Sequence, residues 1–179
     1  MRSRQPRSHE RRARPPLDEA ALKELALAYV ARFATSRAKL GQYLRRKLHE
    51  RGWAGEADAP VSAIVEQLAA AGYIDDPAFA LAKARTLGSR GFGERRVAVA
   101  LRAAGIEEDD GAAARDLARD GATAAALRFA KRKRLGPFAT SPPDRRESDK
   151  AFAAMIRAGH PFELAKHVLG LPPDFDAEA

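Results

Sequence analysis

The sequence has no cysteine and few aromatic side chains, which make up 7% of its 179 residues. Without cysteine the chain has neither disulfide bonds nor thiolate ligands for zinc, and a reducing compartment is compatible with it. Its four histidines are scattered, and only His160 and His167 could share a helix face. Because no third ligand accompanies this pair, we interpret the histidines as ordinary surface residues and expect no metal site.

Long apolar runs are also missing. No window approaches about 18 uncharged apolar residues, so we expect no membrane-spanning helix. The N-terminus does not have the pattern of a secretory signal, because Asp18, Glu19, Lys23 and Glu24 stand where such a signal is apolar. We therefore expect a cytoplasmic protein.

Positive charge is present in excess and is unevenly distributed. The formal net charge is +8, and residues 1–16 carry +5 of it, from six arginines and one glutamate. This stretch has almost nothing to bury, so we predict a disordered basic tail. Residues 172–179 form a predicted acidic tail. The arginines of the basic tail are Arg2, Arg4, Arg7, Arg11, Arg12 and Arg14.

Abundant alanine, sparse β-branched residues and frequent helix punctuation predict an all-α fold. Ser36 can cap a helix that ends at Gly52. Asp76 followed by Pro77 combines a capping carboxylate with a proline in the first turn. A later helix ends at Gly105, and every periodic segment has helical spacing.

The predicted helices form a repeat. When the chain is shifted by 53 residues against itself, apolar, arginine and glycine positions coincide. The coinciding pairs include Ser36 with Ser89, Leu44 with Val97, Leu48 with Leu101, Gly52 with Gly105 and Trp53 with Ile106. Gly159 lies 54 residues after Gly105 and indicates a third unit. We predict three tandem three-helix, helix-turn-helix-like repeats over residues 17–73, 74–120 and 121–171.

The stretch SRGFGERRVAVALRAAGI, residues 89–106, could be a phosphate-binding glycine loop or a turn between two helices. An alanine-rich helix precedes it where a nucleotide loop needs a strand, and no Lys-Ser or Lys-Thr ends it. We therefore place Gly91 and Gly93 in the turn between the first two helices of the second repeat. Asp75 and Asp76 are interpreted as helix caps rather than as an acid-base or metal pair. No nucleophile or cofactor loop is recognisable, so we expect neither catalysis nor a cofactor.

The segment GYIDDPAFA from Gly72, together with the stretch just described, resembles the signature of the RecX family of recombination regulators. The resemblance implies three tandem three-helix units in an elongated, curved protein that binds the RecA recombinase filament, and we expect a monomer. It also implies inhibition of strand exchange, ATP hydrolysis and coprotease activity, with no catalysis by the regulator itself. The sequence departs from the family pattern in its arginine-rich tail and at His160, where an aromatic residue usually follows the glycine.

Basic residues recur in all three predicted repeats and are the candidate binding residues. A single charged run is more often a solvated face, but its recurrence favours a binding surface. The ligand could be the phosphate backbone of single- or double-stranded DNA, an acidic recombinase surface, or both. The second hypothesis is a sequence-tolerant DNA-binding protein that coats the strand. The candidates are Arg32, Arg37, Lys39, Arg45, Arg46, Arg85, Arg90, Arg95, Arg96, Arg102, Arg128, Lys131, Arg132, Lys133 and Arg134.

Deleting residues 1–16 should weaken binding to bare DNA and flatten its salt dependence. The reason is that the tail's arginines can contact phosphates without an ordered structure. Each lost contact should reduce the slope of log affinity against log salt by about 0.9 on duplex DNA. The measurement is a salt series of binding isotherms. Loss of filament inhibition with bare-DNA binding intact would contradict this role of the tail.

Overall fold

The computed structural model describes residues 15–173 and 175. Their regular secondary structure is helical, joined by turns and loops, apart from one isolated β-bridge between Leu17 and Trp53. The predicted all-α fold is confirmed. Positions 1–14 of the predicted basic tail lie outside the described residues, as do positions 174 and 176–179 of the acidic one. The α-helices are α1 (Glu19–Val30), α2 (Arg37–Arg51), α3 (Val61–Ala70), α4 (Asp76–Ser89), α5 (Glu94–Ala103), α6 (Ala112–Asp120), α7 (Ala122–Lys133), α8 (Arg145–Arg157) and α9 (Phe162–Leu169), with a 3-10 helix η1 (Gly136–Phe138) between α7 and α8.

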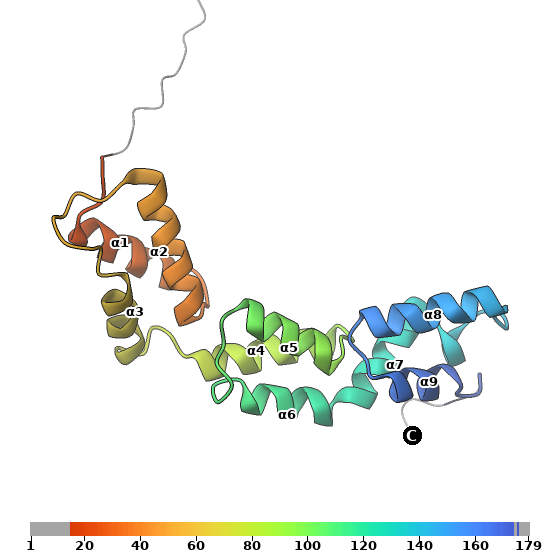
Figure 1. The fold of residues 1–179 in the computed structure, drawn as a ribbon. Helices are drawn as coiled ribbons and strands as arrows, with labels where there is room; N and C mark the ends of the chain where they lie inside the picture. The colour runs from red at the N-terminus through yellow and green to blue at the C-terminus, as the bar shows by residue number, and fades with distance from the viewer. Residues whose placement is uncertain (1–14, 174, 176–179) are drawn as a thin grey trace, which may run out of the picture.

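The helices form three groups, α1–α3, α4–α6 and α7–α9, which follow one another along an extended, bent molecule (Figure 1). Each group surrounds its own cluster of buried apolar side chains, represented by Leu44 in the first, Leu101 in the second and Met155 in the third. We propose that these groups are the predicted repeats over residues 17–73, 74–120 and 121–171, and we call them units 1, 2 and 3.

Capping side chains start several of the helices. Ser36 Oγ accepts a hydrogen bond from the Lys39 amide at 3.2 Å, as predicted for the start of α2. At α4 the cap is Asp75, whose Oδ1 accepts from the Ala78 amide at 2.8 Å. The capping role predicted for Asp76 is wrong, because Asp76 is the first helical residue and its buried side chain bonds to unit 1.

The internal alignment holds at the C-terminal ends of the middle helices but fails at their N-terminal ends. α2 has 15 residues and α5 has 10, so one constant shift cannot match both ends. Ser36 is the N-cap of α2, whereas Ser89 is the last residue of α4, and the N-cap of α5 is Gly93. Gly91, at φ +77, lies between α4 and α5, where the sequence placed the turn. The structural equivalent of Ser36 is therefore Gly93.

Units 1 and 2 meet through the ends of their middle helices. Ser36 Oγ donates a hydrogen bond to the carbonyl of Ala104, the C-cap of α5, at 2.5 Å. The backbone amide of Arg37 donates to Asp76 Oδ1 at 3.0 Å. Gly105 follows at φ +65, and a Cβ there would overlap the Cβ of Ala38. The N-terminus of α2 thus docks on the C-terminus of α5.

Units 2 and 3 meet in the same way. The Gly93 amide donates to the Ala158 carbonyl at 3.0 Å, and the Arg95 amide donates to the Gly159 carbonyl at 3.2 Å. Ala158 is the C-cap of α8, so the N-terminus of α5 docks on the C-terminus of α8. Helix N-termini carry unpaired N–H groups and C-termini carry unpaired carbonyls. The α5–α8 contact pairs the two directly, whereas at the α2–α5 contact the Ser36 hydroxyl and the Asp76 carboxylate supply the partners. Both contacts align opposite dipole ends.

Replacing Ser36 by alanine should destabilise the protein by about 2 to 3 kcal/mol, because it removes a helix cap and also leaves the buried Ala104 carbonyl without its donor. The matched control is Asp18→Ala, which removes the exposed cap of α1 without touching another unit and should cost about 1 kcal/mol. Denaturant unfolding of both variants measures the difference. Equal losses would show that the bond between the units contributes no stability.

Candidate binding surfaces for nucleic acid and protein

The exposed face of α5 carries two arginines around a valine. Arg95, Val99 and Arg102 are exposed and follow at helical spacing, whereas Val97 and Leu101 are buried in the unit 2 core. Val99 is 48% exposed and places apolar surface between the two charges. No carboxylate among the described residues lies within ion-pair distance of either arginine. This face is therefore free to bind an anionic partner.

Several basic residues of unit 1 are already engaged within the chain. The Lys39 ammonium lies 5.2 Å from the centre of the Phe79 ring of unit 2. Arg46 lies 3.6 Å from Glu50, whose pKa is lowered by a hydrogen bond from Lys47. Arg32 and Arg45 are exposed and form no ion pair within the described part of the chain.

Arg37 belongs to the contact between units 1 and 2. Its guanidinium Nη1 lies 4.0 Å from Asp76 and 3.6 Å from Asp110, both in unit 2. Burial raises the pKa of Asp76, an effect that the hydrogen bond and charge of Arg37 oppose. Because two carboxylates neutralise this arginine, it adds less than Arg95 to the positive charge available to a ligand.

Three arginine side chains meet around the turn between α4 and α5, and the backbone carbonyl of a fourth, Arg90, accepts from one of them. Arg96 and Arg132 place their guanidinium groups 5.9 and 5.8 Å from the centre of the Phe92 ring. Arg132 also donates a hydrogen bond to the carbonyl of Arg90, and Arg128 donates to the carbonyl of Gly88 at 3.3 Å. The arginines of α7 therefore bind the carbonyls at the C-terminal end of α4, where the helix dipole is negative.

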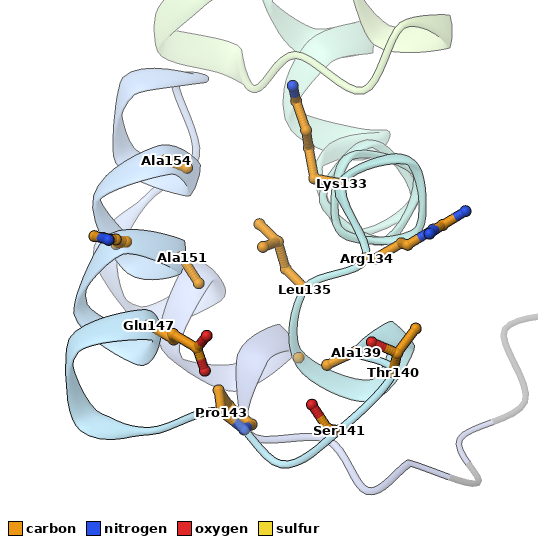
Figure 2. Close-up of a pocket in the computed structure, with 12 residues that line it drawn as sticks. Lys133, Arg134, Leu135, Ala139, Thr140, Ser141, Pro143, Glu147, Ala151 and Ala154 are labelled. Carbon is orange, nitrogen blue, oxygen red and sulfur yellow. The ribbon is translucent and has the colours of Figure 1, made fainter.

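The end of α7 carries three further candidates, Lys131, Lys133 and Arg134, all exposed. Lys133 and Arg134 border a cavity of about 490 Å³ between α7, the loop after η1 and the start of α8. Figure 2 shows the Arg134 side chain pointing away from this cavity and the Glu147 carboxylate pointing toward it. Glu147 Oε2 accepts from the Asp144 amide at 3.1 Å as part of a capping box.

The structure thus places some candidates on an open face of α5, some in a cluster around Phe92 and some in contacts between units, while others are exposed on unit 1 and at the end of α7. Arg85 stands on α4 beside the cluster and lines the same surface hollow as Arg128. Sequence reasoning missed Phe92, Val99 and Asp110. The two glycines beside Phe92 were the available signal for an aromatic side chain at a turn.

The interpretation of His160 as a surface histidine is wrong. Its side chain is fully buried, and its Nε2 lies 3.1 Å from the Gly91 carbonyl, across the contact between units 2 and 3. A carbonyl only accepts, so Nε2 carries the proton, while Nδ1 is buried without a partner. Burial lowers the pKa of this imidazole. His49 and His167 are exposed, and His9 lies outside the described residues.

Among residues 15–173 and 175, no three His, Asp or Glu side chains gather closely enough to hold a metal ion. In the same part of the chain, every helix is too short or too polar to cross a membrane.

Comparison with known proteins identifies the family. No protein-family model matches the sequence. The regulatory protein RecX of Myxococcus xanthus (strain DK1622) is 35% identical over 163 residues, covering 85% of this chain and 86% of the relative. The chain belongs to the RecX family.

Solved RecX structures share the fold. A crystal structure of regulatory protein RecX superposes with a TM-score of 0.64 at 20% identity, covering 84% of this chain and 70% of that one. RecX from Lactobacillus salivarius gives a TM-score of 0.64 at 18% identity, covering 84% and 93%. At these identities the likeness concerns the fold alone. The 35% identical relative places this RecX-family chain among regulatory proteins.

The stability of the protein should fall as the pH drops below 6.5, the ordinary pKa of histidine, because the pKa of His160 in the folded protein is lower than that. Between the two values the unfolded chain binds the proton more readily, so folding is penalised; above 6.5 the penalty vanishes. His160→Phe should be less stable by about 1 to 3 kcal/mol at pH 7.5, since the Gly91 carbonyl loses its donor.

The difference in free energy of unfolding between wild type and His160→Phe should become smaller toward pH 5.5. Denaturant unfolding across a pH series measures it. His167→Phe replaces an exposed histidine and is the control, for which the difference from wild type should change little with pH. A gap for His160→Phe that stayed constant would show that the buried imidazole does not titrate in this way.

Proposed function

We propose that this RecX-family chain binds the RecA recombinase filament on DNA and inhibits its strand-exchange, ATPase and coprotease activities. The observation that carries the proposal is the 35% identity with a regulatory protein RecX over most of both chains. The open arginine face of α5 supports it, because acidic protein surface and DNA phosphates both attract such a face. The regulator acts as a monomer in the cytoplasm, by binding and not by catalysis.

An extended molecule suits a filament partner. Its three units follow one another, so basic residues of successive units are presented over a length that a compact domain of the same size does not reach (Figure 1). The proposed surface comprises the exposed candidates on α2, α5 and α7. The α5 face lies at the centre, and the arginines around Phe92 extend it toward unit 3.

The alternative is a sequence-tolerant protein that coats DNA. The specific observation in its favour is the +5 charge of residues 1–16, which need no recombinase to attract phosphates. Stoichiometry separates the two functions. A regulator of filaments should slow ATP hydrolysis by RecA on single-stranded DNA at sub-stoichiometric amounts, whereas a coating protein must cover the strand. Titration of the chain into RecA and single-stranded DNA, with ATP hydrolysis as the readout, tests the proposal.

Replacing Arg95 and Arg102 together by glutamate should impair inhibition strongly while changing stability by no more than about 0.5 kcal/mol per site, because both side chains are exposed. The double change lowers the net charge from +8 to +4, since each substitution removes two charges. The control is Lys23→Glu with Arg119→Glu, which lowers it equally at residues that already pair with Glu19 and Asp116.

Inhibition titrations and salt series of DNA binding read out both variants. If α5 contacts phosphates, the salt slope on single-stranded DNA should fall by about 0.7 per lost contact. If α5 contacts recombinase carboxylates, inhibition should weaken while bare-DNA binding is spared. Inhibition at the wild-type concentration by a folded Arg95, Arg102 variant would exclude this face as the functional surface.

A further inference from the structure

A surface hollow lies where α4, α6 and α7 meet, between units 2 and 3. Its volume is about 300 Å³, and cavities of about half that volume accept a benzene-sized group. The lining is mostly methyl and methylene surface, with the exposed Leu117 at its margin and the Phe92 ring as its aromatic member. The residues that line it are Ala84, Arg85, Gly88, Ser89, Phe92, Leu117, Ala118, Gly121, Ala125 and Arg128.

Two arginines from different units give this apolar hollow its charge. Arg85 is contributed by α4 and Arg128 by α7. No carboxylate of the described chain lies within ion-pair distance of either guanidinium. An occupant that buries an apolar group here and carries negative charge beside it would therefore satisfy both parts of the site.

Gly88 is independent evidence that the hollow is kept open for a ligand. It lies inside α4 without a positive φ, and a Cβ placed on it would meet no atom within 4 Å. The glycine that the end of this helix needs is Gly91, at φ +77. Alanine at position 88 would favour the helix and would fit, so neither backbone geometry nor packing within the chain requires glycine there. Its effect is to leave the wall of the hollow open.

We propose that this hollow binds a short acidic segment of a protein partner, with one aliphatic side chain inserted between Arg85 and Arg128 and carboxylates of the segment on the two guanidinium groups. A protein segment fits better than a nucleobase, because the guanidinium groups of Arg96 and Arg132 already lie against the Phe92 ring, the one aromatic group of the lining. The remaining walls are aliphatic. The site goes beyond the proposed function and does not rest on it, since a peptide can bind here whether or not a recombinase is inhibited.

The test is an NMR titration of the isotope-labelled full-length chain with a capped five-residue peptide that has one leucine between two pairs of glutamates. The amides of Gly88, Ala118, Gly121 and Ala125 should shift together. A peptide with glycine in place of the leucine should bind roughly tenfold more weakly or worse, because burying a leucine side chain is worth about that factor. Replacing the glutamates by glutamines should weaken binding as well.

Gly88→Leu fills the hollow and should weaken peptide binding at least roughly tenfold, by the same burial argument. Gly88→Ala is the matched control, which removes the glycine without filling the space and should keep binding within about twofold of wild type. Both should melt at or above the wild-type temperature, because the position is helical and unobstructed.

Three results would overturn the proposal. They are equal binding of the leucine and glycine peptides, undiminished binding by a folded Gly88→Leu variant, and shifts confined to other parts of the molecule. Shifts of the same amides with a thymidine oligonucleotide but not with the leucine peptide would instead assign the hollow to nucleic acid.

Discussion

The contact between a helix N-terminus and a helix C-terminus determines how the rest of this molecule is arranged. The N-terminus of α2 docks on the C-terminus of α5, and the N-terminus of α5 docks on the C-terminus of α8. Each time the positive end of one helix dipole lies against the negative end of the next. At the α5–α8 contact backbone amides donate directly to backbone carbonyls, whereas at the α2–α5 contact the Ser36 hydroxyl donates to the Ala104 carbonyl and Asp76 accepts from the Arg37 amide. Both contacts thus give partners to groups that helix ends leave unpaired. Most of each apolar cluster stays within its own group, but Phe92 of unit 2 packs against the cluster of unit 3, so apolar contact as well as hydrogen bonding joins these two units.

This contact places strict limits on the residues that form it. Gly93 and Gly159 approach so closely that a Cβ on either would overlap backbone atoms of the other unit. Gly159 also has a φ of +95, which side-chain-bearing residues rarely adopt. His160 then fills the adjoining space and bonds back to Gly91. Gly91 and Gly93 are spaced as in a phosphate-binding loop, but the Gly93 amide donates to the Ala158 carbonyl at the end of α8.

The same arrangement divides the basic residues by role. Arg37, Arg128 and Arg132 bind acceptors of another unit and help to set the angle between units. Arg95 and Arg102 stand on the far side of α5 from its core and keep their charge for a partner. Because α5 is docked at both ends, this exposed face is held in a defined orientation relative to units 1 and 3. A binding surface spread over separate units needs that fixed orientation to engage one partner.

The sequence by itself determined the all-α class and the ends of several helices, because helical periodicity, caps and glycine stops act over a few residues along the chain. It also located the exposed arginines of α5, since residues seven apart on one helix share a face wherever that helix packs. Only the tertiary structure showed that the internal alignment of α2 with α5 holds at their C-terminal ends and fails at their N-terminal ends. It alone also showed that Asp76 bonds to Arg37 and not to its own helix, and that His160 is buried. These depend on atoms brought together from 39 and 69 residues apart. No pattern within a few residues of sequence predicts such a hydrogen bond, because the two groups come together only when the units dock.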